Sequence, residues 1–163
     1  MLFRSFVVDT LKGKCDGTFL DIGCCDYKDI SNTYYLETEL NWKGIAIDID
    51  CNHRQGWIDN RPNSIFVCTD ATTLDYSELL LQNNMPKIID YLSLDLEPPV
   101  LTLKALEKLF ETDYIFRVVT FETDYYRQQD TRDISRKLFE SRGYKFMFDK
   151  NQQDDFYVYE KLI

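Results

Sequence analysis

Phe19-Leu20-Asp21-Ile22-Gly23 is the stretch that decides the fold. The short apolar run at 18–22 predicts a buried strand, and Gly23 closes it. A glycine after a strand lets the chain turn sharply and brings backbone N–H groups close to a ligand. The loop lacks the Gly-x-Gly-x-x-Gly pattern, which disfavours a dinucleotide with its pyrophosphate. The stretch therefore predicts the first strand of a sheet, followed by a turn that a ligand can approach closely.

Strand-like and helix-like segments alternate outward from this stretch. Short apolar runs bounded by Gly, Pro, Asn or Asp predict further strands at 44–49, 64–68, 87–96 and 114–121. Helical spacing predicts helices at 32–40, 74–82, 100–110 and 131–141, with another in the first dozen residues. Segments 144–148 and 156–160 predict an antiparallel hairpin. The alternation predicts one α/β domain over 1–163, with a doubly wound sheet that binds ligands at the carboxyl ends of its strands.

Composition narrows the class of protein. The chain has 163 residues, 44% of them hydrophobic and 15% aromatic, enough for one packed core. Its net charge of -9 disfavours a nucleic-acid partner, because an acidic surface repels phosphate. Its apolar runs fall short of the roughly 20 residues that cross a bilayer, and the N-terminus lacks the features of a signal peptide. We expect a cytoplasmic protein without a membrane partner, and the sequence carries no signal for an oligomeric state.

The cysteines and the single histidine offer little chemistry. Five cysteines, an odd number that includes adjacent Cys24 and Cys25, do not resemble a disulfide framework. A Cys-x-x-Cys pair is absent, so we expect no zinc site. His53 is interpreted as a surface helix residue. A Cys-His mechanism would have to run through His53 alone, which disfavours it.

Carboxylates follow the first three predicted strands in turn. Asp21 ends the first strand, where it can accept from an amino group. Asp48 lies 25 residues beyond Gly23, where nucleoside-binding sheets place the acid that accepts the ribose hydroxyls. Asp70 follows the third strand and can accept from an adenine amino group, while Asp50 is expected to cap the next helix. Three successive strands that end in Asp predict an adenosine-type ligand.

A second group of carboxylates follows the fourth and fifth strands. Asp95, Glu97, Glu122 and Asp124 are expected to converge, because the ends of neighbouring parallel strands meet at one edge. Such a group could supply a general base, bind a divalent ion or hold a polar substrate. Asp95, Glu97 and Glu122 are the candidate catalytic residues. A magnesium-like ion held by Asp95, Glu122 and Asp124 is an alternative activator, but we do not expect a metal.

The chain also resembles a known family. The resemblance lies in Phe19-Leu-Asp-Ile-Gly23, Ser31-Asn-Thr-Tyr-Tyr-Leu-Glu37, Leu40-Asn-Trp-Lys-Gly-Ile-Ala-Ile-Asp48 and Ile89-Asp-Tyr-Leu-Ser-Leu-Asp-Leu-Glu97. It continues through Gly143-Tyr144 and Asp154-Asp-Phe-Tyr-Val158. These motifs resemble FkbM-type methyltransferases, which are class I O-methyltransferases dependent on S-adenosylmethionine (SAM). The resemblance covers most of the chain in order.

The resemblance implies a Rossmann-like, seven-stranded sheet in the order 3-2-1-4-5-7-6 and a role for each motif. Asp21 and Gly23 would surround the methionine part of SAM, Asp48 would hold the ribose, Asp70 would face the adenine, and Asp95 would lie near the methyl group. The rest of the predicted cofactor-binding set is Cys24, Asn32, Ile49 and Ala71.

Two departures from the family pattern qualify the functional expectation. Cys25, Asp26 and Tyr27 stand where the family has a second small residue, and Pro98-Pro99 follows Glu97 where the family has glycine. The leading hypothesis is methyl transfer to a hydroxyl of a small polar or sugar-like acceptor. The alternative is a methyltransferase-fold binding module without turnover. A nicotinamide-dependent oxidoreductase is disfavoured by the missing glycines.

Overall fold

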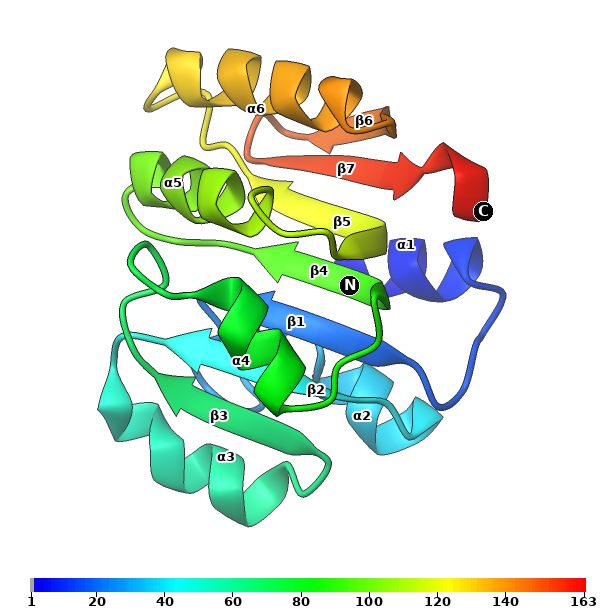
Figure 1. The fold of residues 1–163 in the computed structure, drawn as a ribbon, viewed down its shortest axis with the longest axis vertical. Coiled ribbons are helices and arrows are strands. Elements are labelled where there is room, and N and C mark those ends of the chain that lie inside the picture. Colours follow the sequence, from blue (N-terminus) through cyan, green and yellow to red (C-terminus); the bar gives the residue numbers. More distant parts are fainter. Residues whose placement is uncertain (1) are drawn as a thin grey trace.

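A computed structural model describes residues 2–163 as a seven-stranded sheet with helices on both faces (Figure 1). The strands are β1 (Thr18–Ile22), β2 (Lys43–Asp48), β3 (Ser64–Cys68), β4 (Ile88–Leu94), β5 (Ile115–Glu122), β6 (Tyr144–Lys150) and β7 (Asp154–Tyr159). The α-helices are α1 (Leu2–Thr10), α2 (Tyr34–Leu40), α3 (Arg54–Asn60), α4 (Tyr76–Gln82), α5 (Pro99–Leu109) and α6 (Gln129–Ser141). The short 3-10 helices are η1 (Cys51–His53) and η2 (Glu160–Leu162).

The strand order is β3-β2-β1-β4-β5-β7-β6, which confirms the predicted sheet. Strands β1 to β5 pair in parallel, and β7 pairs antiparallel with both β5 and β6. From β1 the chain builds β2 and β3 on one side, and then crosses over to build β4 on the other side of β1. Parallel sheets bind ligands at such a switch point, beyond the carboxyl ends of the strands.

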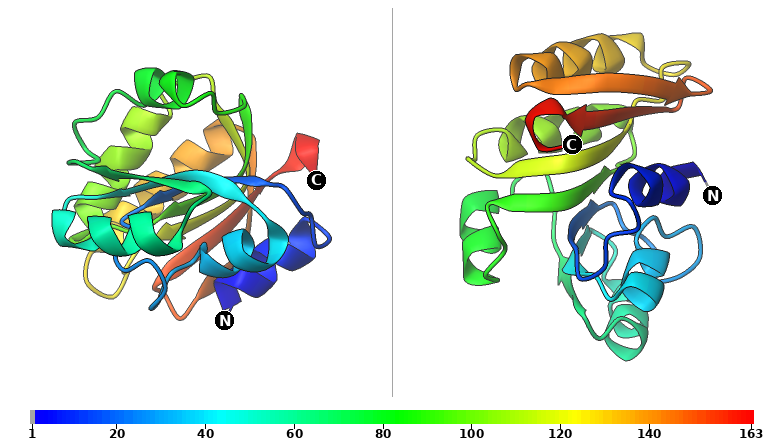
Figure 2. Two further views of the ribbon diagram at one scale, coloured as in Figure 1. Left: turned by 90° about the horizontal axis from the view of Figure 1, so that it is seen from below. Right: turned by 90° about the vertical axis from the view of Figure 1, so that its right-hand side faces the viewer.

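The central strands β1, β2, β4 and β5 bury side chains on both faces, which explains their nearly continuous apolar runs. On β1, Leu20 and Ile22 pack with α4, α5 and α6, while Phe19 packs on the other face with α1 and α2. Trp57 of α3 completes that second face against Ala46. The right-hand view of Figure 2 shows α1 and α2 on one side of the sheet and α4 and α5 on the other.

Most predicted elements are present, with shifted ends. The helix predicted at 32–40 begins at Tyr34. The helix predicted at 74–82 begins at Tyr76, because the Asp75 side chain caps it by accepting from Glu78 N–H. A helix was expected after Asp50 but without a predicted range, and helix α3 begins at Arg54, after the 3-10 helix η1. The hairpin strands are longer than predicted, and Asp154 and Asp155 belong to β7 and not to the turn.

One disulfide corrects the interpretation of the cysteines. Cys51 and Cys68 are bonded, with Cα atoms 5.3 Å apart. Cys51 follows β2 and Cys68 ends β3, and these strands are neighbours in the sheet. A separation of 17 residues in the chain hides this proximity. Cys15, Cys24 and Cys25 are free thiols.

None of the helices in the described part of the chain is long and apolar enough to cross a membrane.

Candidate functional site

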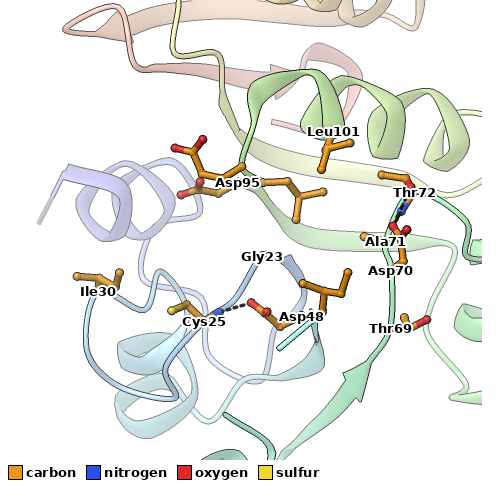
Figure 3. A pocket seen from close by; sticks show the side chains of 13 residues that line it. Gly23, Cys25, Ile30, Asp48, Thr69, Asp70, Ala71, Thr72, Asp95 and Leu101 are labelled. Atoms are coloured by element: carbon orange, nitrogen blue, oxygen red, sulfur yellow. Dashed lines mark hydrogen bonds between the residues drawn. The ribbon is translucent and has the colours of Figure 1, made fainter. Parts of the chain in front are cut away.

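A cavity of about 340 Å³ opens beyond the carboxyl ends of β1, β2, β3 and β4, at the switch point of the sheet (Figure 3). It is lined by Gly23, Cys25, Ile30, Asp48, Ile49, Thr69, Asp70, Ala71, Thr72, Asp95, Leu96, Glu97 and Leu101. Among the predicted cofactor residues, this set contains Gly23, Asp48, Ile49, Asp70 and Ala71. Among the predicted catalytic residues, it contains Asp95 and Glu97.

Gly23 brings the ends of β1 and β4 into direct contact. Its φ is +81°, a left-handed conformation that favours glycine. A Cβ at this position would lie 1.7 Å from the backbone oxygen of Asp95. The N–H groups of Gly23 and Cys24 both donate to the Ile47 carbonyl. Glycine is therefore required here by both conformation and space.

Asp48 is held by the backbone at the centre of the cavity (Figure 3). Its Oδ2 accepts from Cys25 N–H and its Oδ1 accepts from Asp50 N–H, each at 2.8 Å. A carboxylate has about four lone-pair sites, so two remain for the hydroxyls of a ligand. Asp50 caps the following 3-10 helix by accepting from Asn52 N–H, as predicted.

Asp70 lies on the adjacent wall, after β3. Its Oδ1 accepts from Thr72 N–H at 2.8 Å and from Thr72 Oγ1 at 2.7 Å, and these bonds hold the pKa of Asp70 below its usual value. The side chain is exposed and therefore remains an ionised acceptor at neutral pH.

Three predicted cofactor residues do not line the cavity. Asp21 is only 2% exposed, and Thr33 Oγ1 donates to its Oδ2 at 2.8 Å. Burial raises the pKa of Asp21 to about 6, against the opposing effects of Thr33 and nearby Arg61. Cys24 is buried, and burial raises the pKa of its thiol. Asn32 points to β4, where its Nδ2 donates to Ser93 Oγ at 3.0 Å.

A buried ion pair anchors the loop between β1 and α2, and sequence reasoning missed it. The Arg61 side chain is 0% exposed, and its Nε donates to Glu37 Oε2 at 2.6 Å. Arg61 also donates to the Tyr27 carbonyl and to Thr33 Oγ1. Thr33 in turn donates to Asp21. The signal for this network was Glu37, a charged residue beside Leu36 on the buried face of α2.

The predicted acid cluster also forms. Glu122 hydrogen-bonds to Asp95, and burial together with this bond raises the pKa of Glu122 to about 10. Burial likewise raises the pKa of Asp95. Asp154 lies opposite Glu122 in the β5–β7 register and is 7% exposed. Burial and Asp95 raise the pKa of Asp154 to about 7, while Lys150 opposes this shift. Sequence reasoning missed Asp154 because it assigned the residue to the turn.

Arg127 binds two members of the acid cluster, which comprises Asp95, Glu97, Glu122 and Asp124. It donates to both carboxylate oxygens of Glu97, at 2.6 and 2.8 Å, and to Asp124 Oδ2 at 3.0 Å. One carboxylate oxygen each of Glu97, Glu122 and Asp124 lies within 4.8 Å of the others. Hard oxygen ligands of this kind could hold a divalent ion. Arg127 already supplies a positive charge to two of the three.

His53 lies closer to the site than predicted. Its Nε2 is 3.6 Å from Cys25 Sγ and 3.7 Å from Asp50 Oδ2. Both contacts use the same ring nitrogen. A thiol-imidazole-carboxylate relay needs the two different nitrogens, so this arrangement does not form one.

A second hollow of about 360 Å³ adjoins the first cavity, and Ile30 lines both. Its lining, from segments far apart in the sequence, is Phe3, Arg4, Lys28, Ile30, Ser31, Asn32, Tyr34, Tyr35 and Lys150. We refer to these residues as the basic hollow, and to the cavity at the strand ends as the acidic cavity. Sequence reasoning found only Asn32 of this set, and it assigned that residue to the cofactor.

Comparisons with known proteins identify the fold. No protein-family model matches the chain, and no curated protein is significantly similar to it in sequence. A TehB-like SAM-dependent methyltransferase from Corynebacterium glutamicum aligns with a TM-score of 0.58 and 13% identity, over 96% of this chain and 85% of the other. A putative rRNA methylase from Clostridium thermocellum aligns at 0.62 and 13%, over 92% and 90%. The METTL16 methyltransferase domain aligns at 0.62 and 14%, over 96% and 65%. The chain therefore has the Rossmann-like fold of SAM-dependent methyltransferases.

Proposed function

We propose that this protein is a SAM-dependent methyltransferase of the FkbM type, acting on a hydroxyl of a small polar or sugar-like acceptor. The observation that carries the proposal is the acidic cavity at the switch point. Asp48, Asp70, Asp95 and Glu97 line it, and its lining contains no lysine or arginine. Such a cavity suits a ligand with an ammonium group, a sulfonium group, a ribose and an adenine amino group. Its carboxylates would repel the negative charges of a pyrophosphate.

Each residue of the proposed cofactor site has a distinct role. The two free lone-pair sites of Asp48 accept from the ribose hydroxyls, and Asp70 accepts from the adenine amino group. Ile49 and Ala71 provide apolar contact for the adenine ring. Gly23 leaves space for close backbone approach of the methionine part, and ionised Asp21 attracts its ammonium group from below the loop. Cys24 and Asn32 hold that loop in place through burial and the Ser93 contact.

Bound SAM would supply an electrophilic methyl group, so the protein has to align the acceptor and remove its proton. Asp95 and Glu122 act as a coupled pair. Glu122, with a pKa of about 10, keeps its proton at neutral pH and donates a hydrogen bond to Asp95. Asp95 lines the cavity and accepts the proton from the acceptor hydroxyl. Glu97, oriented by Arg127, accepts a hydrogen bond from a second acceptor hydroxyl.

Calorimetric titration with SAM and S-adenosylhomocysteine tests the cofactor assignment. We expect each ligand to bind one site per chain. Absence of binding by both ligands at millimolar concentration would reject the proposal. Methyl transfer from labelled SAM to a panel of sugars then separates the enzyme from the binding module. Tight SAM binding without transfer to any hydroxyl acceptor favours the module, for which Pro98 and Pro99 after β4 are the motivating feature.

The proposed location is the cytoplasm, and the proposed acceptor is a small molecule and not a nucleic acid. The Cys51–Cys68 bond argues against the cytoplasmic location, because disulfides persist mainly in oxidising compartments. Thiol labelling of the protein in intact cells tests it. Fully reduced Cys51 and Cys68 fit the cytoplasm, whereas a stable bond in cells contradicts it.

A further inference from the structure

The basic hollow has the opposite charge to the cavity beside it. Arg4, Lys28 and Lys150 line it, and its lining includes no carboxylate. The whole chain, by contrast, has 28 acidic residues against 19 lysines and arginines. Three cations around one hollow of an acidic protein create a local positive potential, which favours an anionic ligand.

These cations come from three separate parts of the fold and are held in place by aromatic rings. Arg4 belongs to α1, Lys28 to the loop after β1, and Lys150 to the end of β6. Within residues 2–163, none of the three forms an ion pair with a carboxylate. Their positive groups lie 4.7, 5.8 and 4.7 Å from ring centroids, which is within the range of cation–π attraction. The rings, in the same order, are those of Tyr35, Tyr34 and Phe3.

The other lining residues suit a sugar ring. Ser31 and Asn32 offer a hydroxyl and an amide for polar contacts. Tyr34 and Tyr35 combine an apolar ring face with a polar hydroxyl. Asn32 is fixed to β4 through Ser93 Oγ, two residues before Asp95. The hollow is therefore joined to the proposed methyl-transfer site through both Ile30 and Asn32.

The geometry points to the basic hollow as the subsite for an acceptor that carries a phosphate group on a sugar ring. Arg4, Lys28 and Lys150 hold the phosphate, Ser31 and Asn32 contact the ring hydroxyls, and the reacting hydroxyl extends past Ile30 toward Asp95. This inference rests on the proposed function, because it places the acceptor beside the cavity proposed for SAM.

The surroundings favour a small sugar phosphate over a polyanion such as RNA. Asp26 and Asp29 flank Lys28 in the same loop, and the exposed Asp149 precedes Lys150. A strand of RNA that extends beyond the hollow would pass these carboxylates, which repel its phosphates. A single phosphate held within the hollow meets a lining that includes no carboxylate.

Calorimetry with matched probes tests the inference directly. We expect ribose 5-phosphate to bind at millimolar concentration or tighter, and to bind at least tenfold more tightly than ribose. Raising the salt concentration should lower the affinity for ribose 5-phosphate and leave the affinity for ribose unchanged, because salt screens exposed charges. Equal binding of the two probes, or binding of neither, overturns the inference. A short single-stranded RNA that binds far more tightly than ribose 5-phosphate also overturns it, in favour of a polyanion.

Substitutions locate the site. K28Q and K150Q should each lower the affinity for ribose 5-phosphate roughly two- to fivefold, as expected for charge pairs that solvent screens. R4Q should have the same effect. K43Q is the matched control, because Lys43 is an exposed lysine at the amino end of β2 and does not line the hollow. If K43Q weakens binding as much as K28Q does, or if none of the three hollow variants weakens it, the phosphate does not bind in this hollow.

S-adenosylhomocysteine separates the two proposals. Its affinity should be the same in wild type, K28Q and K150Q. If it fails to bind while ribose 5-phosphate binds and responds to K28Q, the proposed function fails and the anion subsite remains. If it binds and ribose 5-phosphate shows no preference over ribose, the proposed function remains and the anion subsite fails.

Discussion

The acidic cavity and the basic hollow share Ile30, yet the fold builds them in different ways. The acidic cavity takes its charged groups from the ends of neighbouring strands, and backbone N–H groups fix Asp48 in place. The basic hollow takes its cations from a helix, a loop and a hairpin, and aromatic rings support them. One region is set by the sheet topology, and the other by elements that surround the sheet.

This contrast predicts how each region responds to change. Groups at strand ends are buried or bonded to the backbone, so their loss should disturb both ligand binding and folding. Arg4 and Lys28 are exposed and Lys150 is half-buried, so solvent screens their charges. Their loss should change the affinity for an anion by a small factor and leave folding intact.

Arg61 supports both regions, and its removal should have the largest effect. R61L would leave Glu37 buried without its cation and release the Tyr27 carbonyl and Thr33. Breaking a buried pair from one side typically costs about 3–5 kcal/mol of the free energy of unfolding. Urea denaturation measures the loss, with R54A as an exposed control on the neighbouring helix. A midpoint equal to that of the wild type would show that the network does not hold the loop.

Asp21 should give the acidic cavity a characteristic pH dependence. Its folded pKa of about 6 exceeds the ordinary value of 3.8, so the folded state binds more protons than the unfolded state between these values. Stability contributed by Asp21 should therefore fall as pH rises from about 4 to 6, by about 3 kcal/mol in total. D21N removes this contribution, so urea denaturation should show the variant gaining stability relative to wild type across that window. A pH-independent difference between the two proteins would refute the raised pKa of buried Asp21.

Gly23 and Gly13 form a matched pair for testing close backbone approach. Both have positive φ, +81° and +69°, but a Cβ meets the Asp95 backbone at Gly23 and nothing within 4 Å at Gly13. G23A should therefore cost about 1–3 kcal/mol more than G13A, as over-packing does. G23A should also lower the affinity for S-adenosylhomocysteine at least tenfold, whereas G13A should leave that affinity unchanged. Similar losses in both variants would mean that conformation alone, and not contact with Asp95, requires glycine.

A crossed pair of variants gives the smallest but most specific effect. D48N should lower the affinity for S-adenosylhomocysteine and leave that for ribose 5-phosphate unchanged. K28Q should lower the affinity for ribose 5-phosphate roughly two- to fivefold and leave that for S-adenosylhomocysteine unchanged. Calorimetry of both ligands on both variants measures the four affinities. If either variant lowers the affinity for both ligands equally, the acidic cavity and the basic hollow act as one site.

The sequence predicted the features that follow from local patterns and from the rule that the carboxyl ends of parallel strands meet at one edge. Strand β1 has the predicted ends, and Asp48, Asp70 and Asp95 reach one cavity because strand ends in a parallel sheet converge. Features that depend on distant segments escaped prediction. Arg61 pairs with a residue 24 positions away, and Cys51 bonds to Cys68 across two strands. The basic hollow needs α1, a loop and the final hairpin together, and no local pattern marks that meeting.

The most direct test of the central claim is a crystal structure with bound S-adenosylhomocysteine. We expect the ribose hydroxyls on Asp48, the adenine amino group on Asp70, the ammonium group on the side of Asp21, and the sulfur facing Asp95. Adenosine bound elsewhere on the protein, or a ribose without contact to Asp48, would contradict this claim.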